Sequence, residues 1–128
     1  MADGVRIEAA QHAGSVWTFA LPRPPAELRI GSRSGSPQEL GLARDPRVLG
    51  VALRRITLRQ GTRSLVLDAS DARLTQGFHE YEAELALRWT DGDAELPASV
   101  FAGFSGPVEL ELEMAGSARY SADQAAAA

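Results

Sequence analysis

The sequence predicts an all-β domain, an antiparallel β-sandwich of jelly-roll type with about eight or nine short strands. Apolar and polar residues alternate with a period of two in a series of short segments, and turn residues separate these segments. Almost no stretch shows the period of a helix. A length of 128 residues suits one domain with its own hydrophobic core. A closed barrel is the second architecture that fits.

Three short strands are predicted before the first long connection. The first covers residues 5–7, although residues 8–11 also fit a helix. The second covers residues 15–21 and is closed by prolines, which cannot continue a ladder of strand hydrogen bonds. The third covers residues 27–32. Their inward apolar residues are Val5, Ile7, Trp17, Phe19, Leu21, Leu28 and Ile30.

Between Gly31 and Gly50 the alternation stops, which predicts a long crossover of the Greek-key kind. Residues 36–39 read Ser-Pro-Gln-Glu, the pattern of a capping box with proline at the first helical position. One short helical turn is therefore expected between Pro37 and Leu40.

The strand over residues 51–58 contains a change of phase. Its apolar pairs, Val51 with Leu53 and Ile56 with Leu58, stand at odd and even positions respectively. A β-bulge at Arg54 and Arg55 would return both pairs to the same face. A turn at residues 60–62 and a strand that carries Leu65 and Leu67 follow. That strand ends at Asp68, and residues 69–77 are expected to form a loop.

Residues 80–97 predict a hairpin around which the sheet is arranged. Alternation over residues 80–89 predicts a half-buried strand with Tyr81, Ala83, Leu85, Leu87 and Trp89 on its inward face. Asp91 and Gly92 supply the positive-φ positions that a tight reversal needs, and residues 94–96 begin the returning strand.

The C-terminal part predicts a connector and two more strands. Residues 97–106 connect, with Val100, Phe101 and Phe104 packed beneath. Residues 107–114 alternate apolar residues with glutamates and predict a strand, which Ala115 and Gly116 turn towards a last strand at 118–120. The expected organisation is one β-sandwich domain over residues 1–122 and a disordered alanine-rich tail over residues 123–128.

Charge and composition exclude several functions. All 13 basic residues are arginine, 17 residues are acidic, and the net charge of −4 opposes general attraction to nucleic acids or anionic membranes. The locally basic stretch is interpreted as a solvated strand face that pairs with the glutamate-rich strands; it comprises Arg44, Arg47, Arg54, Arg55 and Arg59. No apolar run is long enough for a membrane span and no secretion signal is visible, so a cytoplasmic location is the default expectation.

Five phrases of the sequence together resemble a known module. They lie at residues 17–22, 28–33 together with 36–37, 45–52, 77–82 and 87–97. Their combination resembles a β-rich accessory module of alphaproteobacterial proteins, found next to Hint (Hedgehog/intein-type) or glycan-related domains. The resemblance implies a β-sandwich with a binding or spacing role, towards a carbohydrate or a cell-surface polymer. Hint self-cleavage is not expected, because the chain has neither cysteine nor asparagine.

The predicted ligand-binding residues are Trp89, Arg88, Asp91, Asp93 and His79. An indole at Trp89 would lie flat under a sugar ring while neighbouring polar groups hydrogen-bond the hydroxyls. The competing interpretation is that Trp89 belongs to the core, because it shares its position in the alternation with Leu85 and Leu87. Alternatively, the module binds a protein partner or a second copy of itself through a strand edge.

No catalytic residue, metal site or cofactor is predicted. Cysteine is absent and the chain has two histidines, so a zinc site lacks ligands. Asp91 and Asp93 are too few oxygen ligands for calcium and fit a turn better. The glutamates at 109, 111 and 113 have a spacing that glycosidases also show, but they are interpreted as a solvated strand face.

Overall fold

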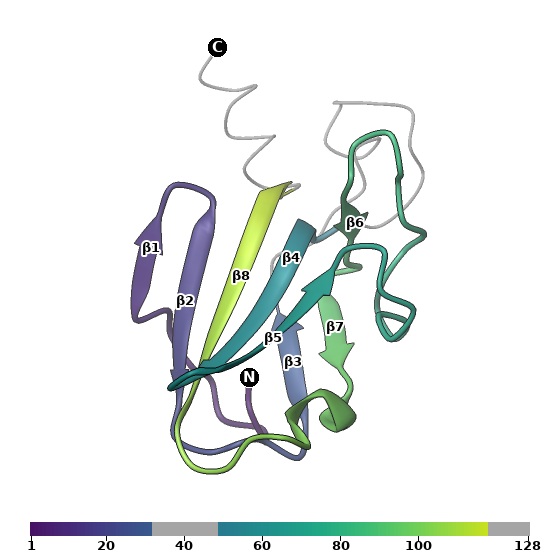
Figure 1. Ribbon diagram of the computed structural model, residues 1–128. Helices are drawn as coiled ribbons and strands as arrows, with labels where there is room; N and C mark the ends of the chain where they lie inside the picture. The colour runs from purple at the N-terminus through teal and green to yellow at the C-terminus, as the bar shows by residue number, and fades with distance from the viewer. Residues whose placement is uncertain (32–48, 118–128) are drawn as a thin grey trace.

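The computed structural model describes residues 1–31 and 49–117 and is all-β, as the sequence predicts (Figure 1). The strands are β1 (Gln11–Ala13), β2 (Val16–Leu21), β3 (Leu28–Gly31), β4 (Val51–Gln60), β5 (Arg63–Asp68), β6 (Arg88–Trp89), β7 (Asp93–Leu96) and β8 (Val108–Ser117). One 3-10 helix, η1 (Ala98–Phe101), precedes β8. Within these two ranges no helix is long and apolar enough to cross a membrane.

Some predicted features lie outside the described residues. They are the helical turn between Pro37 and Leu40, the strand at 118–120, the tail over 123–128, and Arg44 and Arg47 of the basic stretch.

The strands form one large and one small antiparallel sheet. The six-stranded sheet has the order β1-β2-β8-β4-β5, and β6 also pairs with β4. The second sheet consists of β3 and β7 and lies behind the first in the view of Figure 1. The long strands β4 and β8 pair along most of their length at the centre of the large sheet, so they set the register of the other strands.

Side chains from both sheets enter one buried hydrophobic cluster. In the large sheet, Leu58 and Ile56 of β4 lie opposite Leu110 and Leu112 of β8. The small sheet contributes residues such as Leu96 to the same cluster. The predicted connector packs against it as well, because Val100 and Phe101 are buried and Phe104 is partly buried there. Each fully buried aliphatic or aromatic side chain contributes about 1.5–3 kcal/mol to folding.

The predicted bulge in β4 is confirmed. Leu53 pairs with Met114 and Arg55 with Glu113, so Arg54 is an extra residue in β4. Arg54 and Arg55 are both exposed, while the apolar residues on either side of them are buried. A second irregularity, between Ala52 and Leu53, leaves Ala115 as the extra residue in β8.

The predicted turn at Ala115 and Gly116 is wrong. β8 continues through both residues to Ser117, and Gly116 pairs with Ala52 of β4. The physical reason is that β4 extends far enough to offer a partner for these positions. A bulge therefore accommodates the small residues that the sequence suggests as a turn.

The predicted strand over residues 5–7 is also wrong. Val5 makes only an isolated bridge with Ala2, around a turn in which Asp3 and Gly4 have φ of 50° and 79°. Val5 is 61 % exposed. The first strand is instead β1, which Gly14 (φ 60°) connects to β2 as a hairpin.

The predicted strand over residues 80–89 is formed only at its end, as β6. Residues 82–87 make a tight turn that an antiparallel bridge between Glu82 and Leu87 closes, with Ala86 at a φ of 53°. Leu85 is consequently 55 % exposed instead of facing inward. Among the described residues β4 pairs with this segment only at Arg88 and Trp89, so the alternation before them has no ladder to join.

The predicted hairpin over residues 80–97 is wrong as well, because its two arms belong to different sheets. β6 pairs with β4, whereas β7 pairs with β3. Gly92 does adopt the expected positive φ, at 102°. Thr90, with no exposed surface, fixes the crossing point: its Oγ1 accepts a hydrogen bond from the Val51 backbone N–H at 3.1 Å.

Candidate functional site

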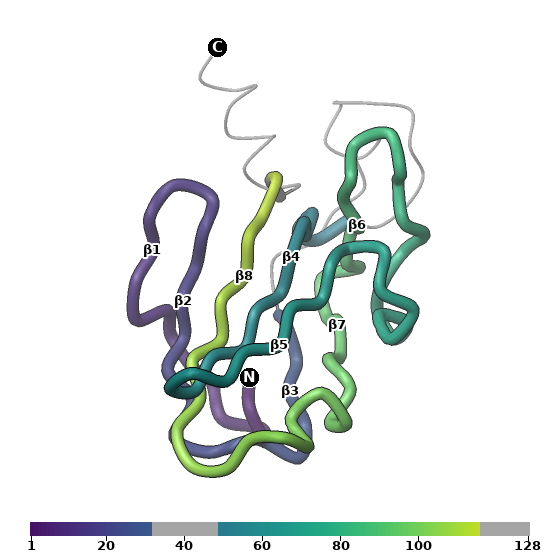
Figure 2. The backbone as a smooth tube through the Cα atoms, in the orientation of Figure 1, coloured from purple at the N-terminus to yellow at the C-terminus, as the bar shows by residue number. Residues whose placement is uncertain are grey.

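The loop after β5 returns alongside β6 and brings three of the predicted site residues together. The His79 N–H donates to Trp89 O and the Asp91 N–H donates to Gly77 O, both at 2.9 Å. Phe78 and Thr90 form the antiparallel bridge between these bonds. Figure 2 shows the backbone leaving the sheet and coming back at β6.

This pairing places His79, Trp89 and Asp91 on one face. His79 stands opposite Trp89 across the bridge, and Trp89 stands opposite Ala52 of β4. Asp91 is two residues beyond Trp89, so it points to the same side. We call these three residues the 79–91 patch. His79 and Trp89 are half-buried, and Asp91 is exposed.

Trp89 is not part of the main hydrophobic cluster, contrary to the competing interpretation of the sequence. Its cross-strand neighbour is Ala52, and Leu87 stands two residues before it. Both are buried, but neither belongs to that cluster. The indole therefore has an apolar support on one side and retains some exposure. Trp17 is half-buried too; its ring stacks on His12 with 3.6 Å between ring centroids.

Arg88 points to the other face of β6, next to Leu53 of the core. Its Nη1 donates to the carbonyl oxygen of Leu74, and its Nε is buried without a hydrogen-bond partner among the described atoms. The guanidinium thus ties the loop over residues 69–77 to the sheet and lies away from the 79–91 patch.

Asp93 also lies apart from the patch, because it belongs to β7 in the other sheet. Its Oδ2 is 3.3 Å from Nη1 of Arg29 on β3. The N-terminal ammonium of Met1 donates to Arg29 O at 2.7 Å. Burial lowers the pKa of this ammonium, although the negative charge of Asp93 acts in the opposite direction. A hydrogen bond from Arg29 to Glu27, followed by the charge of Asp93, raises the pKa of Arg29. Asp93 therefore serves this charged cluster at the N-terminus.

The Asp91 side chain shapes the turn into β7. Its Oδ1 accepts a hydrogen bond from the Asp93 N–H at 2.9 Å, which is an Asx turn. The patch is thus held by backbone pairing on one side and by this turn on the other.

A charged pair stabilises the loop that leads to the patch. Arg73 donates to both carboxylate oxygens of Asp71, at 3.0 Å and 2.9 Å. This hydrogen bonding by Arg73 holds the pKa of Asp71 below its ordinary value of 3.8, and the charge of Arg88 acts in the same direction. Because the pKa is lowered in the folded state, the stabilisation is present above pH 3.8 and is lost as the pH falls through the lowered value.

We therefore expect Asp71→Asn to lower the free energy of unfolding at neutral pH by less than about 1 kcal/mol, since the pair is near the surface. The difference between wild type and variant should shrink once the pH falls below 3.8. Urea unfolding of both proteins at neutral and acidic pH measures this. A difference that stays constant across the pH range would show that the carboxylate charge contributes nothing.

The outward face of the six-stranded sheet carries a second charged surface, which we call the Glu–Arg face. It consists of Glu109, Glu111 and Glu113 of β8 with Arg55 and Arg59 of β4. Arg55 lies opposite Glu113 and Arg59 opposite Glu109. Arg59 forms ion pairs with Glu109, at 3.8 Å, and with Glu111. For Arg59 the predicted pairing of a basic strand face with glutamates is therefore confirmed. Arg55 stands opposite Glu113 in the register, but its ion pair is with Asp68 of β5, at 3.6 Å.

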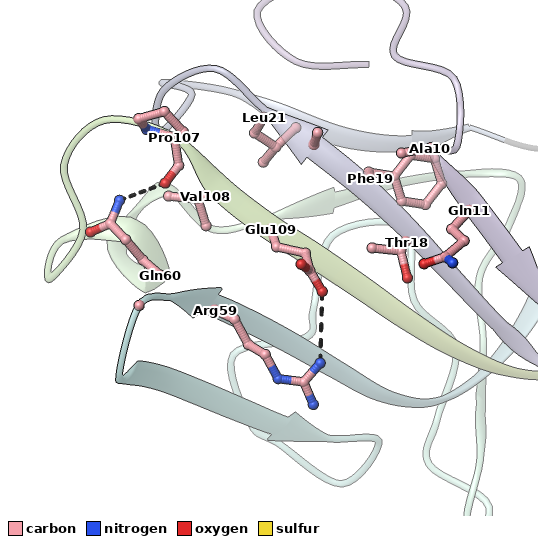
Figure 3. Close-up of a pocket in the computed structure, with 12 residues that line it drawn as sticks. Ala10, Gln11, Thr18, Phe19, Leu21, Arg59, Gln60, Pro107, Val108 and Glu109 are labelled. Atoms are coloured by element: carbon pink, nitrogen blue, oxygen red, sulfur yellow. Dashed lines mark hydrogen bonds and ion pairs between the residues drawn. The ribbon is translucent and has the colours of Figure 1, made fainter.

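An open hollow of about 500 Å³ lies at one end of this face. Figure 3 shows Arg59 and Glu109 on one side of it and Gln11 and Thr18 on the other. Gln60 Nε2 donates to Pro107 O at 2.7 Å at its rim. The sequence contains no signal for this hollow, because it depends on β2 and β4 both pairing with β8.

In the part of the chain that the structure describes, no three histidine or acidic side chains stand close enough to hold a metal ion. No family model, curated protein or solved structure matches the chain.

Proposed function

We propose that this chain is a non-catalytic accessory module that binds a carbohydrate or a cell-surface polymer through the 79–91 patch. The observation that carries the proposal is the pairing of residues 77–79 with residues 89–91, which sets His79, Trp89 and Asp91 on one face. Trp89 and Asp91 are already two residues apart in an extended segment. His79 lies ten residues before Trp89, and this pairing makes it their neighbour.

The chemistry of the three side chains suits a sugar. The indole of Trp89 offers a flat apolar surface for the C–H groups of a pyranose ring. The Asp91 carboxylate accepts hydrogen bonds from hydroxyl groups, and the imidazole of His79 both donates and accepts. A few polar groups around one aromatic ring give orientation and specificity while the ring supplies contact area. Arg88 and Asp93 have structural partners of their own, Leu74 O and Arg29 respectively, and lie apart from the patch.

The proposed architecture is a two-layer β-sandwich of jelly-roll type. It is supported by the hydrophobic cluster to which both sheets contribute side chains, Leu58 and Leu110 from one and Leu28 and Leu96 from the other. The resemblance to modules that accompany glycan-related domains agrees with this proposal. The acidic residues nearest to a hydrolytic arrangement, Glu109 and Glu111, are both engaged by Arg59, which favours a binding role over catalysis.

Trp89→Ala is expected to weaken binding of the recognised glycan by about 5- to 150-fold, because stacking on an aromatic ring is worth about 1–3 kcal/mol when estimated from base stacking on aromatic residues. Trp89→Phe keeps a smaller ring and should retain part of the affinity. A glycan array identifies the sugar, and titration calorimetry then compares the variants. Circular dichroism checks that both variants fold.

Trp17→Phe provides a matched spectroscopic control, because it leaves Trp89 as the sole tryptophan. The fluorescence of the Trp17→Phe variant should change when the glycan is added. The fluorescence of the Trp89→Phe variant, which comes from Trp17, should not change. The proposal is wrong if no glycan on the array binds the wild-type protein, or if Trp89→Ala binds with unchanged affinity.

A further inference from the structure

Among the described strands, none pairs with the outer edge of the end strand β5, and this edge suits pairing with another strand. β5 is the last strand in the order β1-β2-β8-β4-β5 and pairs only with β4 among the described strands. It has six residues, whereas β1, at the opposite end of the sheet, has three. Its sequence, Arg-Ser-Leu-Val-Leu-Asp, contains no proline or glycine, and its two charged residues stand at its two ends, so its middle is not blocked against an incoming strand. Val66, at its middle, is a large apolar residue that is 49 % exposed.

Hydrogen-bond geometry shows which backbone groups of β5 point away from β4. Gln60 and Arg63 close the two-residue turn between the strands, and the Ala69 N–H donates to Arg54 O at 3.1 Å. Arg63 and Ala69 are both odd-numbered, so the odd-numbered residues of this segment are the ones whose backbone groups bond β4. The N–H and C=O groups of the even-numbered residues, Ser64, Val66 and Asp68, therefore point outward. The Asp68 carbonyl accepts the Asp71 N–H at 2.9 Å, so its N–H is the group left for an incoming strand.

We propose that two copies of this chain associate by antiparallel pairing of β5 with β5 of the second copy, about a two-fold axis at Val66. In this register Val66 faces Val66 of the second copy, and Ser64 faces Asp68. A shift by one residue would set the core side of one copy against the solvent side of the other, which the period of two forbids. A shift by two residues towards the turn would leave Asp68 opposite Thr62, beyond the end of β5.

The side chains in this register are complementary. Two valines meet at the axis, and β-branched pairs stabilise a sheet by about 0.2–1 kcal/mol each. The Ser64 hydroxyl can donate to the Asp68 carboxylate of the second copy. Within each chain this carboxylate also lies 3.6 Å from Nε of Arg55. On the opposite face Leu65 comes to lie beside Leu67. No like charges are brought opposite one another.

The axis stands perpendicular to the sheet, so the two six-stranded sheets become one continuous sheet with the same face outward. If the proposed function is right, the two 79–91 patches then lie on the same side, and a polymer with repeated units can engage both. The association itself does not depend on that function. Edge pairing alone buries less area than the roughly 1,200–2,000 Å² of a typical stable interface, so we expect a reversible dimer.

Analytical ultracentrifugation over a wide range of protein concentrations tests the association. We expect the wild-type protein to dimerise with rising concentration, and Val66→Lys and Val66→Glu each to remain monomeric, because each places like charges opposite one another at the axis. An equimolar mixture of the two variants should restore a dimer, since lysine then faces glutamate. Leu85→Glu, a charge at a residue of similar exposure outside β5, should dimerise like the wild type.

Cysteine cross-linking tests the register, because the natural chain contains no cysteine. Val66→Cys should form an intermolecular disulfide on oxidation, since Cα atoms of a hydrogen-bonded antiparallel pair lie about 5.5 Å apart, within the range for a disulfide. In Ser64→Cys the two cysteines lie four residues out of register, roughly 14 Å apart, and should not cross-link. A monomer at every concentration, a dimer that survives both charged variants, or equal cross-linking of the two cysteine variants would overturn the proposal.

Discussion

Replacing Gly77 with alanine is expected to lower the free energy of unfolding by about 2–5 kcal/mol. Gly77 has a φ of 80°, and a Cβ atom there would lie 2.5 Å from Asp93 O and 2.6 Å from Ala94 Cα. The left-handed conformation costs a non-glycine residue about 1–2 kcal/mol. The overlap is with backbone atoms of β7, so relieving it requires movement of the chain, at about 1–3 kcal/mol.

Gly61→Ala is the matched control for this substitution. Gly61 also has a positive φ, of 60°, but nothing lies within 4 Å of a Cβ atom there. Its replacement should therefore cost only the conformational part, about 1–2 kcal/mol. Urea unfolding of both variants separates the two effects. If Gly77→Ala is no more destabilising than Gly61→Ala, the loop does not approach β7 as closely as described.

The same close approach connects stability with binding. Gly77 O accepts the Asp91 N–H, and Gly77 stands two residues before His79. A shift of this backbone away from β7 would disturb the pairing that brings His79 next to Trp89. We therefore expect Gly77→Ala to weaken glycan binding as well, although its side chain does not belong to the 79–91 patch.

The sequence predicts best those strands whose neighbours lie on both sides. β2 and β8 alternate apolar and polar residues as expected, and the bulge at Arg54 could be deduced because β4 needs both of its apolar pairs on the core side. In these strands burial on one face dictates the pattern residue by residue. The local sequence therefore contains enough information to place them.

The segment before β6 shows where this reasoning fails. Alternation over residues 80–89 is as regular as in β8, yet alternation does not say which strand is available as a partner. Residues 82–87 instead close on themselves, with Ala86 in a conformation unusual for a residue with a Cβ atom. The Asp91-Gly92 turn was predicted from its residue types, but those types do not reveal that the chain changes sheets there.

The candidate site was predictable in part for the same reason. Trp89 and Asp91 are two residues apart in an extended segment, so the sequence alone puts them on one side. His79 joins them only through the bridge between Phe78 and Thr90, a pairing for which the sequence gives no signal. Arg88 is separated from the patch because its side chain points to the other face of β6. Asp93 is separated from it because the chain has changed sheets by that residue.

Leu58→Ala and Leu85→Ala are expected to differ in stability by about 2–5 kcal/mol, although both leucines occupy apolar positions of an alternating pattern. Leu58 has no exposed surface and lies between Leu65 and Leu110 in the centre of the large sheet. Its truncation removes buried methyl groups and leaves a cavity that neighbouring strands cannot fill. Leu85 is 55 % exposed on the turn, so its truncation should cost less than about 0.5 kcal/mol.

Equilibrium unfolding in urea, read by far-ultraviolet circular dichroism, gives both values. Circular dichroism suits the comparison because it follows the loss of strand structure in the same way in both variants. If Leu85→Ala is as costly as Leu58→Ala, then residues 80–89 pack as the inward-facing strand that their alternation predicts, and the turn that brings β6 to β4 is not formed. A small effect at Leu85 beside a large one at Leu58 means that strand partners, and not the alternation, decide which apolar residues of this chain are buried.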